Sequence, residues 1–514
     1  MSKTIIIIGA GLAGLSAALQ AAENGCNVKL VSSLPSERAQ SVMAEGGINA
    51  ALNTKDENDS PEEHFTDTIK AACGLADPNA VWGMTQAAPE LVHWLLKLGV
   101  KFNMSGYDDV DLRNFGGQKK KRTAFAQSDT GKQIMTAMID AVRRKEASGM
   151  VERFSHHSFL TLRLCGNICC GCVIRDEYSQ ETVELPGDAV IVATGGMHGL
   201  FGNTTGSLSN TGEVTAELFR LGVPLANGEM IQYHPTTVKC GGKRMLISEA
   251  ARGEGGRLFA MKDGKQWYFM EEKYPELGNL MPRDITAREI WKVSHESEVF
   301  LDMTEISKEV ISNKLSGLAD DCMTYLHKDI RKEPVPVLPG IHYFMGGILV
   351  DEQHRTSIQN LYAAGECCAQ YHGANRLGGN SLLGALYGGR VAAKSACEQA
   401  DVVDLSCATQ IDFPPASQIS EIKQLNKVMQ ETMGVVRNEN TLLNGIQTVQ
   451  ALTGNLPLLG MAVLKSALAR KESRGAHWRE DYPKSNDDDY LKTTVARFDG
   501  KQIQISFVPV PERR

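Results

Sequence analysis

Three glycines near the N-terminus are the first residues whose spacing suggests chemistry. Gly9, Gly11 and Gly14 follow four consecutive isoleucines and precede an alanine-rich segment. In such a setting the first glycine makes a tight turn, the second admits a pyrophosphate close to the backbone, and the third lets a helix pack on a strand. The N-terminus of that helix faces the phosphates. The pattern predicts a helix over 15–24, a second strand over 28–31 and a bound dinucleotide.

The end of that second strand departs from the usual dinucleotide pattern. An acidic residue normally stands there to bind the ribose, but this chain has Ser32 and Ser33. A serine hydroxyl can also hydrogen-bond a ribose. We therefore keep both serines as candidate cofactor ligands.

Two later segments repeat a buried strand followed by glycine. Residues 188–196 run through Ala193, Thr194 and Gly195, and residues 361–366 end at Glu366. Both resemble the strands that flank FAD in flavoproteins with two dinucleotide-binding motifs. We expect Glu366 to accept hydrogen bonds from the ribityl hydroxyls.

Length and composition exclude several classes of protein. The chain has 514 residues, which favours two to four domains, and a net charge of −7. Mild acidity gives no reason to expect a nucleic-acid or membrane-surface partner. No apolar run approaches the roughly 18 residues that span a bilayer. We expect a cytoplasmic protein without direct membrane insertion.

The cysteines call for a separate interpretation. Four of the 12 cysteines cluster at Cys165, Cys169, Cys170 and Cys172, a spacing unlike standard iron–sulfur ligand patterns. We expect buried thiols on adjoining strands rather than a metal site, although a metal or cluster stays the alternative. Without a secretory signal, structural disulfides are not expected.

A set of separated motifs extends from about Thr4 to about Thr494. Together they resemble the flavoprotein subunits of succinate dehydrogenase and fumarate reductase, with L-aspartate oxidase as a close relative. The motifs lie at 44–48, 64–68, 115–118, 122–123, 129–131, 232–236, 248–256, 282–284, 342–347, 375–382, 472–477 and 480–483. The resemblance implies bound FAD and hydride transfer between flavin N5 and a four-carbon dicarboxylate.

The same resemblance assigns the residues that hold the dicarboxylate. His234, His342 and Arg376 stand where the family grips carboxylates, and the planar fork of an arginine suits that task. Ser248 can add a hydroxyl donor. The substrate loop contributes two further residues, Phe115 and Gln118.

Proton delivery is assigned in the same way. Arg283 matches the proton donor of the family, and Glu249 and Arg252, spaced i and i+3, resemble the relay that refills it. The alternative for Arg283 is a purely structural ion pair with Asp284 or another neighbouring acid.

One departure from the family concerns the flavin linkage. Gln40 stands where the membrane-bound enzymes carry the histidine that bonds covalently to FAD, so we expect non-covalent FAD. In the family the covalent link favours succinate oxidation, and its absence favours fumarate reduction. The remaining cofactor contacts that the resemblance implies are Ser41, Ala44, Gly46, Gly47, Asn380, Ser381 and Leu382.

The expected fold class is α/β. A Rossmann-like FAD-binding domain covers 1–228 and 340–398, with an inserted α+β capping domain at 229–339. A linker over Asp401–Pro415 leads to a helical domain at 415–485, and a charged tail at 486–514 contains a strand pair near 493–498 and 502–508.

Several functions compete. The favoured one is fumarate reduction as the catalytic subunit of a fumarate reductase. L-aspartate oxidase is the first alternative, disfavoured because Gln118 stands where that enzyme has an acid. The others are succinate oxidation, an acrylate-type reductase and a non-catalytic FAD-binding subunit. An iron–sulfur subunit is the expected partner, through the region 474–481. The donor behind it (quinol, thiol, NADH or another carrier) stays open.

Overall fold

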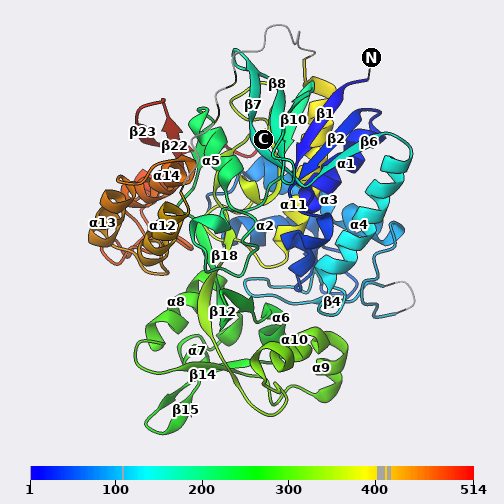
Figure 1. Ribbon diagram of the computed structural model, residues 1–514. Helices are drawn as coiled ribbons and strands as arrows, with labels where there is room; N and C mark the ends of the chain where they lie inside the picture. The colour runs from blue at the N-terminus through cyan, green and yellow to red at the C-terminus, as the bar shows by residue number, and fades with distance from the viewer. Residues whose placement is uncertain (1, 107–108, 402–410, 412, 414–417) are drawn as a thin grey trace.

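A parallel five-stranded sheet forms the centre of the computed structural model, which describes residues 2–106, 109–401, 411, 413 and 418–514. All of its neighbouring strands run parallel (Figure 1). The strands, in spatial order, are β20 (Leu361–Ala363), β10 (Ala189–Val192), β1 (Thr4–Ile8), β2 (Asn27–Ser32) and β6 (Val151–Ser155). This arrangement confirms the predicted Rossmann-like fold.

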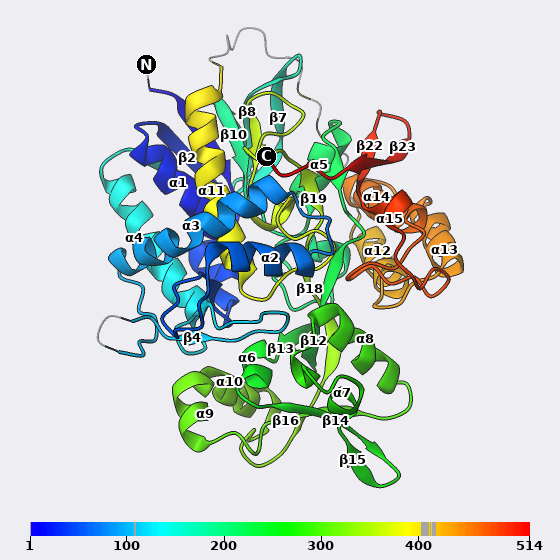
Figure 2. The ribbon, with the colours of Figure 1, turned by 180° about the vertical axis from the view of Figure 1, so that it is seen from behind.

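Helices cover one face of this sheet and a second sheet covers the other. The isoleucines of β1 are buried on both faces, as the unbroken apolar run indicated. On one side lie α1 (Leu12–Glu23), α3 (Pro78–Lys97), α4 (Thr130–Ala147) and α11 (Asn380–Gln399) (Figure 2). On the other lie β7 (His157–Cys165), β8 (Ile168–Asp176) and β9 (Thr182–Pro186). Helix α1 begins three residues earlier than predicted, directly after Gly11.

Short elements surround this core. They are α2 (Pro61–Ala71), β3 (Ile48–Asn49), β4 (Leu112–Arg113), β5 (Thr123–Ala124), α5 (Glu213–Arg220) and the 3₁₀ turn η2 (Gln40–Met43). Strand β5 pairs with both β3 and β4. This small sheet therefore joins the flavin loop to the substrate loop.

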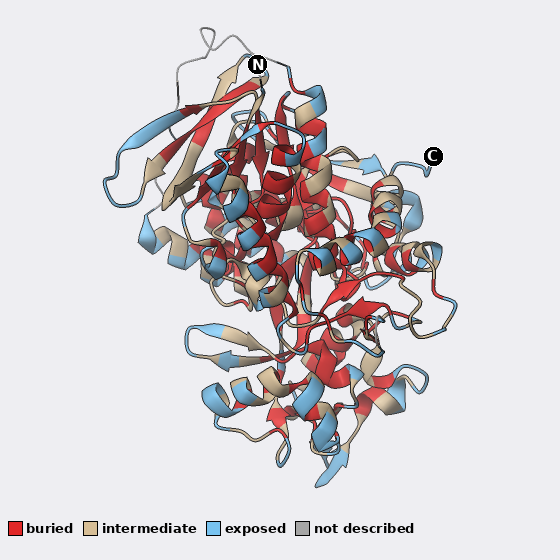
Figure 3. Cartoon of the chain, turned by 90° about the vertical axis from the view of Figure 1, so that its right-hand side faces the viewer, coloured by how far each residue is buried: buried red, intermediate tan, exposed pale blue. Residues whose placement is uncertain are grey.

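Residues between β12 and β18 form the lower lobe of Figure 1. It has its own apolar core, which includes Ile247, Leu258 and Leu301 (Figure 3). We propose this lobe, 229–339, as the capping domain. Its elements are β12 (Ile231–Cys240), β13 (Lys243–Leu246), α6 (Glu249–Gly253), β14 (Arg257–Lys262), β15 (Lys265–Trp267), α7 (Phe269–Lys273), α8 (Arg283–Val293), β16 (Val299–Asp302), α9 (Lys308–Lys314), α10 (Ser316–Asp321), β17 (Val335–Pro336) and β18 (Leu338–Phe344).

The C-terminal part confirms the predicted helices and strand pair. The helices are α12 (Ile419–Thr432), α13 (Glu439–Val449), α14 (Asn455–Ala469) and α15 (Asp487–Tyr490), and the strands are β22 (Lys492–Phe498) and β23 (Ile503–Pro509). Strand β22 also pairs with β11 (Leu225–Ala226), in one sheet with β19 (Gly347–Leu349) and β21 (Cys368–Ala369). The C-terminal tail thus belongs to the same sheet as β11, β19 and β21. Most of the predicted linker, Asp401–Pro415, lies outside the described residues.

The cysteine cluster is partly as expected. Cys169, Cys170 and Cys172 are buried free thiols on β8. Cys165, at the end of β7, forms a disulfide, so the expectation of no structural disulfide is wrong at this position. That expectation rested on the cellular compartment, which governs whether disulfides persist but not which thiols meet. Among the described residues, no group of His, Cys, Asp or Glu could hold a metal ion.

No helix in the described part of the chain is long and apolar enough to cross a membrane.

A buried ionic network joins the C-terminal helices to the body. Arg470, completely buried, pairs with Glu229 and Glu472, each at 2.7 Å, and donates to the Thr494 hydroxyl at 2.7 Å. Arg474 is buried beside it and also pairs with Glu472.

The region 474–481, which the sequence led us to expect at the surface facing an iron–sulfur subunit, contains two buried arginines. Arg479 is fully buried and pairs with Asp481 at 2.6 Å, and Arg474 is held by Glu472 and Asp487. Both side chains are directed into the chain, because their charges are matched there.

We predict that Arg470→Ala lowers the free energy of unfolding by about 3–5 kcal/mol, because it leaves Glu229 buried without its ion-pair partner and leaves Glu472 with Arg474 alone. Urea unfolding followed by circular dichroism measures this loss. The matched control is Arg331→Ala, which removes a half-exposed arginine paired with Asp329 and should cost less than about 1 kcal/mol. Equal losses in the two variants would contradict the structural role of the network.

Candidate functional site

The glycine turn and the start of α1 form a cradle for phosphate. A Cβ on Gly9 would collide with the carbonyl of Ala193, and one on Gly14 with the carbonyl of Gly9. A Cβ on Gly11 would meet only Ala39 and Ser41, each at 3.8 Å, and the N–H of Leu12 donates to the Ser41 hydroxyl at 3.3 Å. The other N–H groups at this helix N-terminus suit a pyrophosphate. Gly9 and Gly14 thus permit the close packing predicted from their spacing, and the approach of a pyrophosphate to Gly11 stays a prediction.

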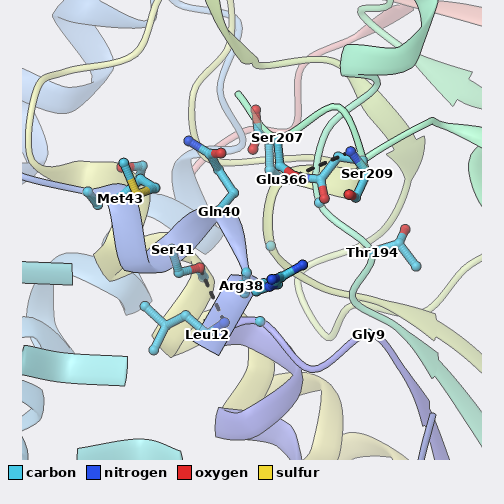
Figure 4. Close-up of a pocket in the computed structure, with 18 of the residues that line it drawn as sticks. Gly9, Leu12, Arg38, Gln40, Ser41, Met43, Thr194, Ser207, Ser209 and Glu366 are labelled. Atoms are coloured by element: carbon cyan, nitrogen blue, oxygen red, sulfur yellow. Dashed lines mark hydrogen bonds between the residues drawn. The ribbon is translucent and has the colours of Figure 1, made fainter. Parts of the chain in front are cut away.

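A cavity of about 890 Å³ opens in front of this cradle. Its walls come from the parallel sheet, the flavin loop, the start of α11 and the lower lobe. In Figure 4 the side chain of Gln40 lies between Arg38 and Met43, with Thr194 and Glu366 nearby. Fifteen predicted cofactor residues line it: Gly9, Gly11, Ser32, Ser33, Gln40, Ser41, Ala44, Gly46, Gly47, Ala193, Thr194, Gly195, Glu366, Ser381 and Leu382.

Two predicted cofactor residues are not in the lining. Gly14 lies behind the cradle, where it permits the close packing described above. The amide of Asn380 contacts His64 and Thr68, at 2.9 and 3.0 Å, and accepts from Asn49 at 2.7 Å. Its side chain therefore braces the start of α11 from behind.

Unpaired polar atoms along the cavity fit a bound FAD. The Ser32 hydroxyl is buried, lines the cavity and has no hydrogen-bond partner among the described residues. Glu366 accepts from the Phe344 amide at 3.0 Å, and burial raises its pKa to about 7. The ribose contact of Ser32 and the ribityl contact of Glu366 stay predictions.

The other end of the cavity gathers the residues predicted to hold substrate. Phe115, His234, Ser248, His342 and Arg376 all line it. They come from the substrate loop, the lower lobe and the start of α11. The structure thus brings five distant motifs to one place, next to the flavin loop.

Arg376 carries a positive charge that no carboxylate neutralises in the described part of the chain. Its guanidinium lies over the Tyr343 ring, 4.4 Å from the centroid, and its Nε has no hydrogen-bond partner. Burial, together with nearby Arg283, lowers its pKa to about 9. Such a group is stabilised by an incoming carboxylate.

The two histidines are neutral hydrogen-bonding groups. Burial, followed by the charge of Arg283, holds the pKa of His234 and of His342 well below the usual range. Their rings meet edge to face, with centroids 5.1 Å apart. The Thr205 hydroxyl contacts His342 Nδ1 at 2.8 Å, and Thr236 contacts His234 Nδ1 at 3.0 Å through its carbonyl. In each ring the other nitrogen, Nε2, is left for a ligand.

The proposed proton relay is a continuous chain of charged groups. Arg283 contacts Glu249 Oε2 through both Nη2 and Nε, at 2.5 and 2.8 Å. Arg252 Nη2 lies 3.4 Å from Glu249 Oε1. Burial acts to raise the pKa of Glu249, but the two guanidinium groups outweigh it and hold the pKa below its ordinary value. Arg283 is thus paired with Glu249 and not with Asp284.

Gln118 takes a position that the sequence did not indicate. It is absent from the cavity lining, and its amide N–H groups donate to Asn49 at 3.0 Å and to the Gly378 carbonyl at 2.9 Å. Asn49 donates to the same carbonyl at 2.7 Å. The side chain that was expected to contact substrate therefore fixes the loop after Arg376.

The sequence analysis missed the side-chain roles of two further residues, Glu45 in the cavity lining and Gln232, which contacts Arg283 and Arg376. Glu45 sits within a quoted motif, and its Oε2 is buried without a hydrogen-bond partner in the described chain. Burial raises the pKa of Glu45 to about 8. Gln232, also in a quoted motif, accepts from Arg283 at 3.1 Å and donates to the Arg376 carbonyl at 2.9 Å. Both positions lie in motifs that the sequence analysis identified, but the motifs did not indicate what the two side chains contact.

At the ribose end of the cavity the sequence indicated Ser32 and Ser33 but not the residues beside them. Ser32 is paired in register with the last residue of β6, which places His156 beside the ribose end. His156 adopts a left-handed backbone, φ 58°, and its ring lies 5.1 Å from that of Tyr178. Tyr178 is 78% exposed and lines the cavity. Only the tertiary fold brings this tyrosine to the cofactor.

Comparison with known proteins identifies the family of the chain. A family model described as "FAD binding domain" matches residues 4–382, and one described as "Fumarate reductase flavoprotein C-term" matches 452–513. These matches, together with the fold and cavity, define an FAD-dependent oxidoreductase.

Individual relatives identify the family within the FAD-dependent oxidoreductases. The chain is 38% identical to a succinate dehydrogenase flavoprotein subunit of Bacillus subtilis, covering 100% of this chain and 98% of the relative. It is 32% identical to the 8-methylmenaquinol:fumarate reductase flavoprotein subunit of Wolinella succinogenes, covering 100% and 92%. A mutant quinol fumarate reductase FrdA of E. coli superposes with a TM-score of 0.90 at 27% identity, over 99% and 97% of the two chains. The chain belongs to the succinate dehydrogenase and fumarate reductase flavoprotein family.

We predict that Tyr178→Ala weakens FAD binding by about 1–3 kcal/mol, because stacking of an aromatic ring on a base contributes that much. Titration of FAD into apoprotein, followed by flavin fluorescence, measures the change. Tyr268→Ala, in the lower lobe and outside the cavity lining, is the matched control and should bind FAD normally. Normal FAD affinity in Tyr178→Ala would show that the tyrosine does not cover the adenine.

Proposed function

We propose that this chain reduces fumarate to succinate as the catalytic flavoprotein subunit of a fumarate reductase. The proposal rests on one observation: two groups with different roles line the same cavity. Arg376 stands there without a carboxylate partner, and Arg283 borders the same space at the end of a buried relay. The first group fits a substrate carboxylate, and the second fits delivery of a proton.

Bound FAD supplies the hydride at N5. The chain must hold both carboxylates and keep the alkene at roughly 3–3.5 Å from the reacting atom. Arg376 suits one carboxylate through its bidentate fork. His234 and His342 add Nε2–H donors in the tautomer whose Nδ1 accepts, from the Thr236 amide at 3.3 Å in His234 and from the Thr205 hydroxyl at 2.8 Å in His342. Cationic donors at this point also stabilise the negative charge that develops on the carboxylate in the transition state.

The chain of ion pairs suggests the route by which the proton is supplied. A guanidinium alone resists deprotonation, so Arg283 can donate only if a proton reaches it as one leaves. Glu249 contacts Arg283 at 2.5 Å and lies 3.4 Å from Arg252. We propose that the proton passes along these three residues toward the cavity.

The direction of the reaction is inferred from Gln40. This residue lines the cavity where a linking histidine would stand, and an amide cannot form that bond. Non-covalent FAD favours reduction of fumarate. A succinate dehydrogenase is the second candidate, since the Bacillus subtilis relative carries that name. Comparison of fumarate reduction by reduced viologen with succinate oxidation by a dye distinguishes the two.

L-aspartate oxidase is less well supported. The amino group of aspartate needs a carboxylate in the cavity to neutralise it. Glu249 is shared between two arginines, and burial raises the pKa of Glu45 to about 8, which disfavours its charged form. Hydrogen peroxide release during incubation with L-aspartate would favour this alternative.

The partner is inferred from the relatives, whose names describe subunits of larger enzymes. We propose an iron–sulfur subunit as the immediate electron donor of this chain. Copurification of an iron–sulfur protein with the tagged chain tests this proposal.

We predict that acid precipitation releases all FAD into the supernatant, because Gln40 replaces the linking histidine. Flavin fluorescence of the supernatant and of the washed pellet measures the partition. Fluorescence that stays with the denatured chain would contradict non-covalent binding.

We predict that Arg376→Lys raises the Michaelis constant for fumarate at least about thirtyfold, because losing one partner of a buried charged pair costs about 2–5 kcal/mol. The lysine keeps the charge but loses the fork. The FAD content should stay normal, which serves as the folding control. An unchanged Michaelis constant would assign Arg376 a structural role.

We predict that Arg283→Ala abolishes fumarate turnover while FAD and dicarboxylate binding stay measurable, because the proton is needed only in the transition state. Glu249→Gln should slow turnover less, since it impairs resupply and leaves the donor in place. Transfer of electrons from reduced flavin to a dye is the control for both variants. Fumarate turnover within a few-fold of normal in Arg283→Ala would move the donor elsewhere, with His234 next.

A further inference from the structure

Two free thiols meet at the far end of the cofactor helices. Cys26 follows α1 by three residues, and Cys397 lies in the last turn of α11. Their sulfur atoms are 2.9 Å apart, less than 1 Å longer than a disulfide bond of about 2.05 Å. Cys26 is 5% exposed, and Cys397 is half-buried and therefore accessible to a small oxidant.

The two helices that carry this pair are those whose N-termini face the cavity. Gly11 and Leu12 at the start of α1, and Ser381 and Leu382 at the start of α11, all line it. A link between the helix C-termini would therefore act on both walls of the cofactor site.

Close packing transmits such a link along the helices. The Ser16 hydroxyl of α1 donates to the Leu386 carbonyl of α11 at 2.7 Å. A Cβ on Gly389 would collide with the carbonyl of Ala13, so the first turn of α1 touches the backbone of α11. The two helices, side by side in Figure 2, are thus held together near the start of α1, and the thiol pair lies at their C-terminal ends.

We propose that Cys26 and Cys397 form a reversible disulfide that fixes α1 against α11 and so retains FAD. The two thiols lose two protons and two electrons to a disulfide oxidant of the glutathione class. One thiolate attacks the oxidant to give a mixed disulfide, and the second cysteine displaces the remaining thiol. The oxidant leaves as two thiols, which balances the reaction.

The groups around the two cysteines determine the rate of thiol–disulfide exchange. The Lys3 ammonium donates to the Cys397 carbonyl at 2.8 Å and favours the thiolate. Burial, together with Cys26, raises the pKa of Cys397 more strongly than Lys3 lowers it. Because the thiolate is the reactive form, exchange at neutral pH is slow. It should take minutes to hours, in the range of uncatalysed disulfide exchange.

The first test detects the bond itself. Holoprotein is equilibrated with oxidised and reduced glutathione, quenched in acid, alkylated and digested for mass spectrometry. The proposal requires a linked Cys26–Cys397 peptide that disappears in excess reduced glutathione. Independent alkylation of both cysteines after oxidising equilibration would overturn it.

The second test measures the consequence. Oxidation should raise the melting temperature of the holoprotein by about 2–5 °C, given the long loop that the bond closes and the size of the chain, and should slow FAD release on heating. Cys397→Ser should show neither effect, whereas Cys73→Ser, which leaves the pair intact, should show both. A linked peptide without any change in FAD release would refute the proposed role in cofactor retention.

Discussion

The site depends on the sharing of one buried carboxylate between two buried arginines. Glu249 contacts Arg283 and Arg252 at once, and burial makes each of these charges costly to leave unpaired. The three residues therefore hold one another in place. Because Glu249 is shared in this way, Arg376 has no ion pair within the described residues, and its Nε stays available for a ligand. This local balance of charge supports the proposed proton path and the proposed anion site.

The fold explains how distant segments reach this arrangement. The parallel sheet directs β1, β10 and β20 toward the cavity, and the glycine turns after them leave room for a cofactor. Strands β12 and β18 carry His234 and His342 from the lower lobe to the same place. Gln118 and Asn49 then fix the Gly378 loop. Each catalytic side chain is held by backbone that belongs to a different part of the sequence.

The sequence predicted the structure most reliably where interactions within a few residues determine it. The isoleucine run with its glycines defined β1, the cradle and α1, since period and turn chemistry act within a few residues. The sequence could not predict that Gln118 faces Asn49 or that Arg479 is buried. It also could not predict that Tyr178 borders the cavity. Those outcomes depend on which distant surfaces meet, and motif spacing contains no such information.

The most direct test of the central claim is an anaerobic single-turnover measurement on the isolated holoprotein. The flavin is reduced with dithionite, mixed with fumarate in a stopped-flow spectrometer, and the products are assayed. The account predicts full reoxidation of the flavin with one succinate formed per flavin. A flavin that stays reduced with fumarate, yet is reoxidised by a dye, would contradict the account.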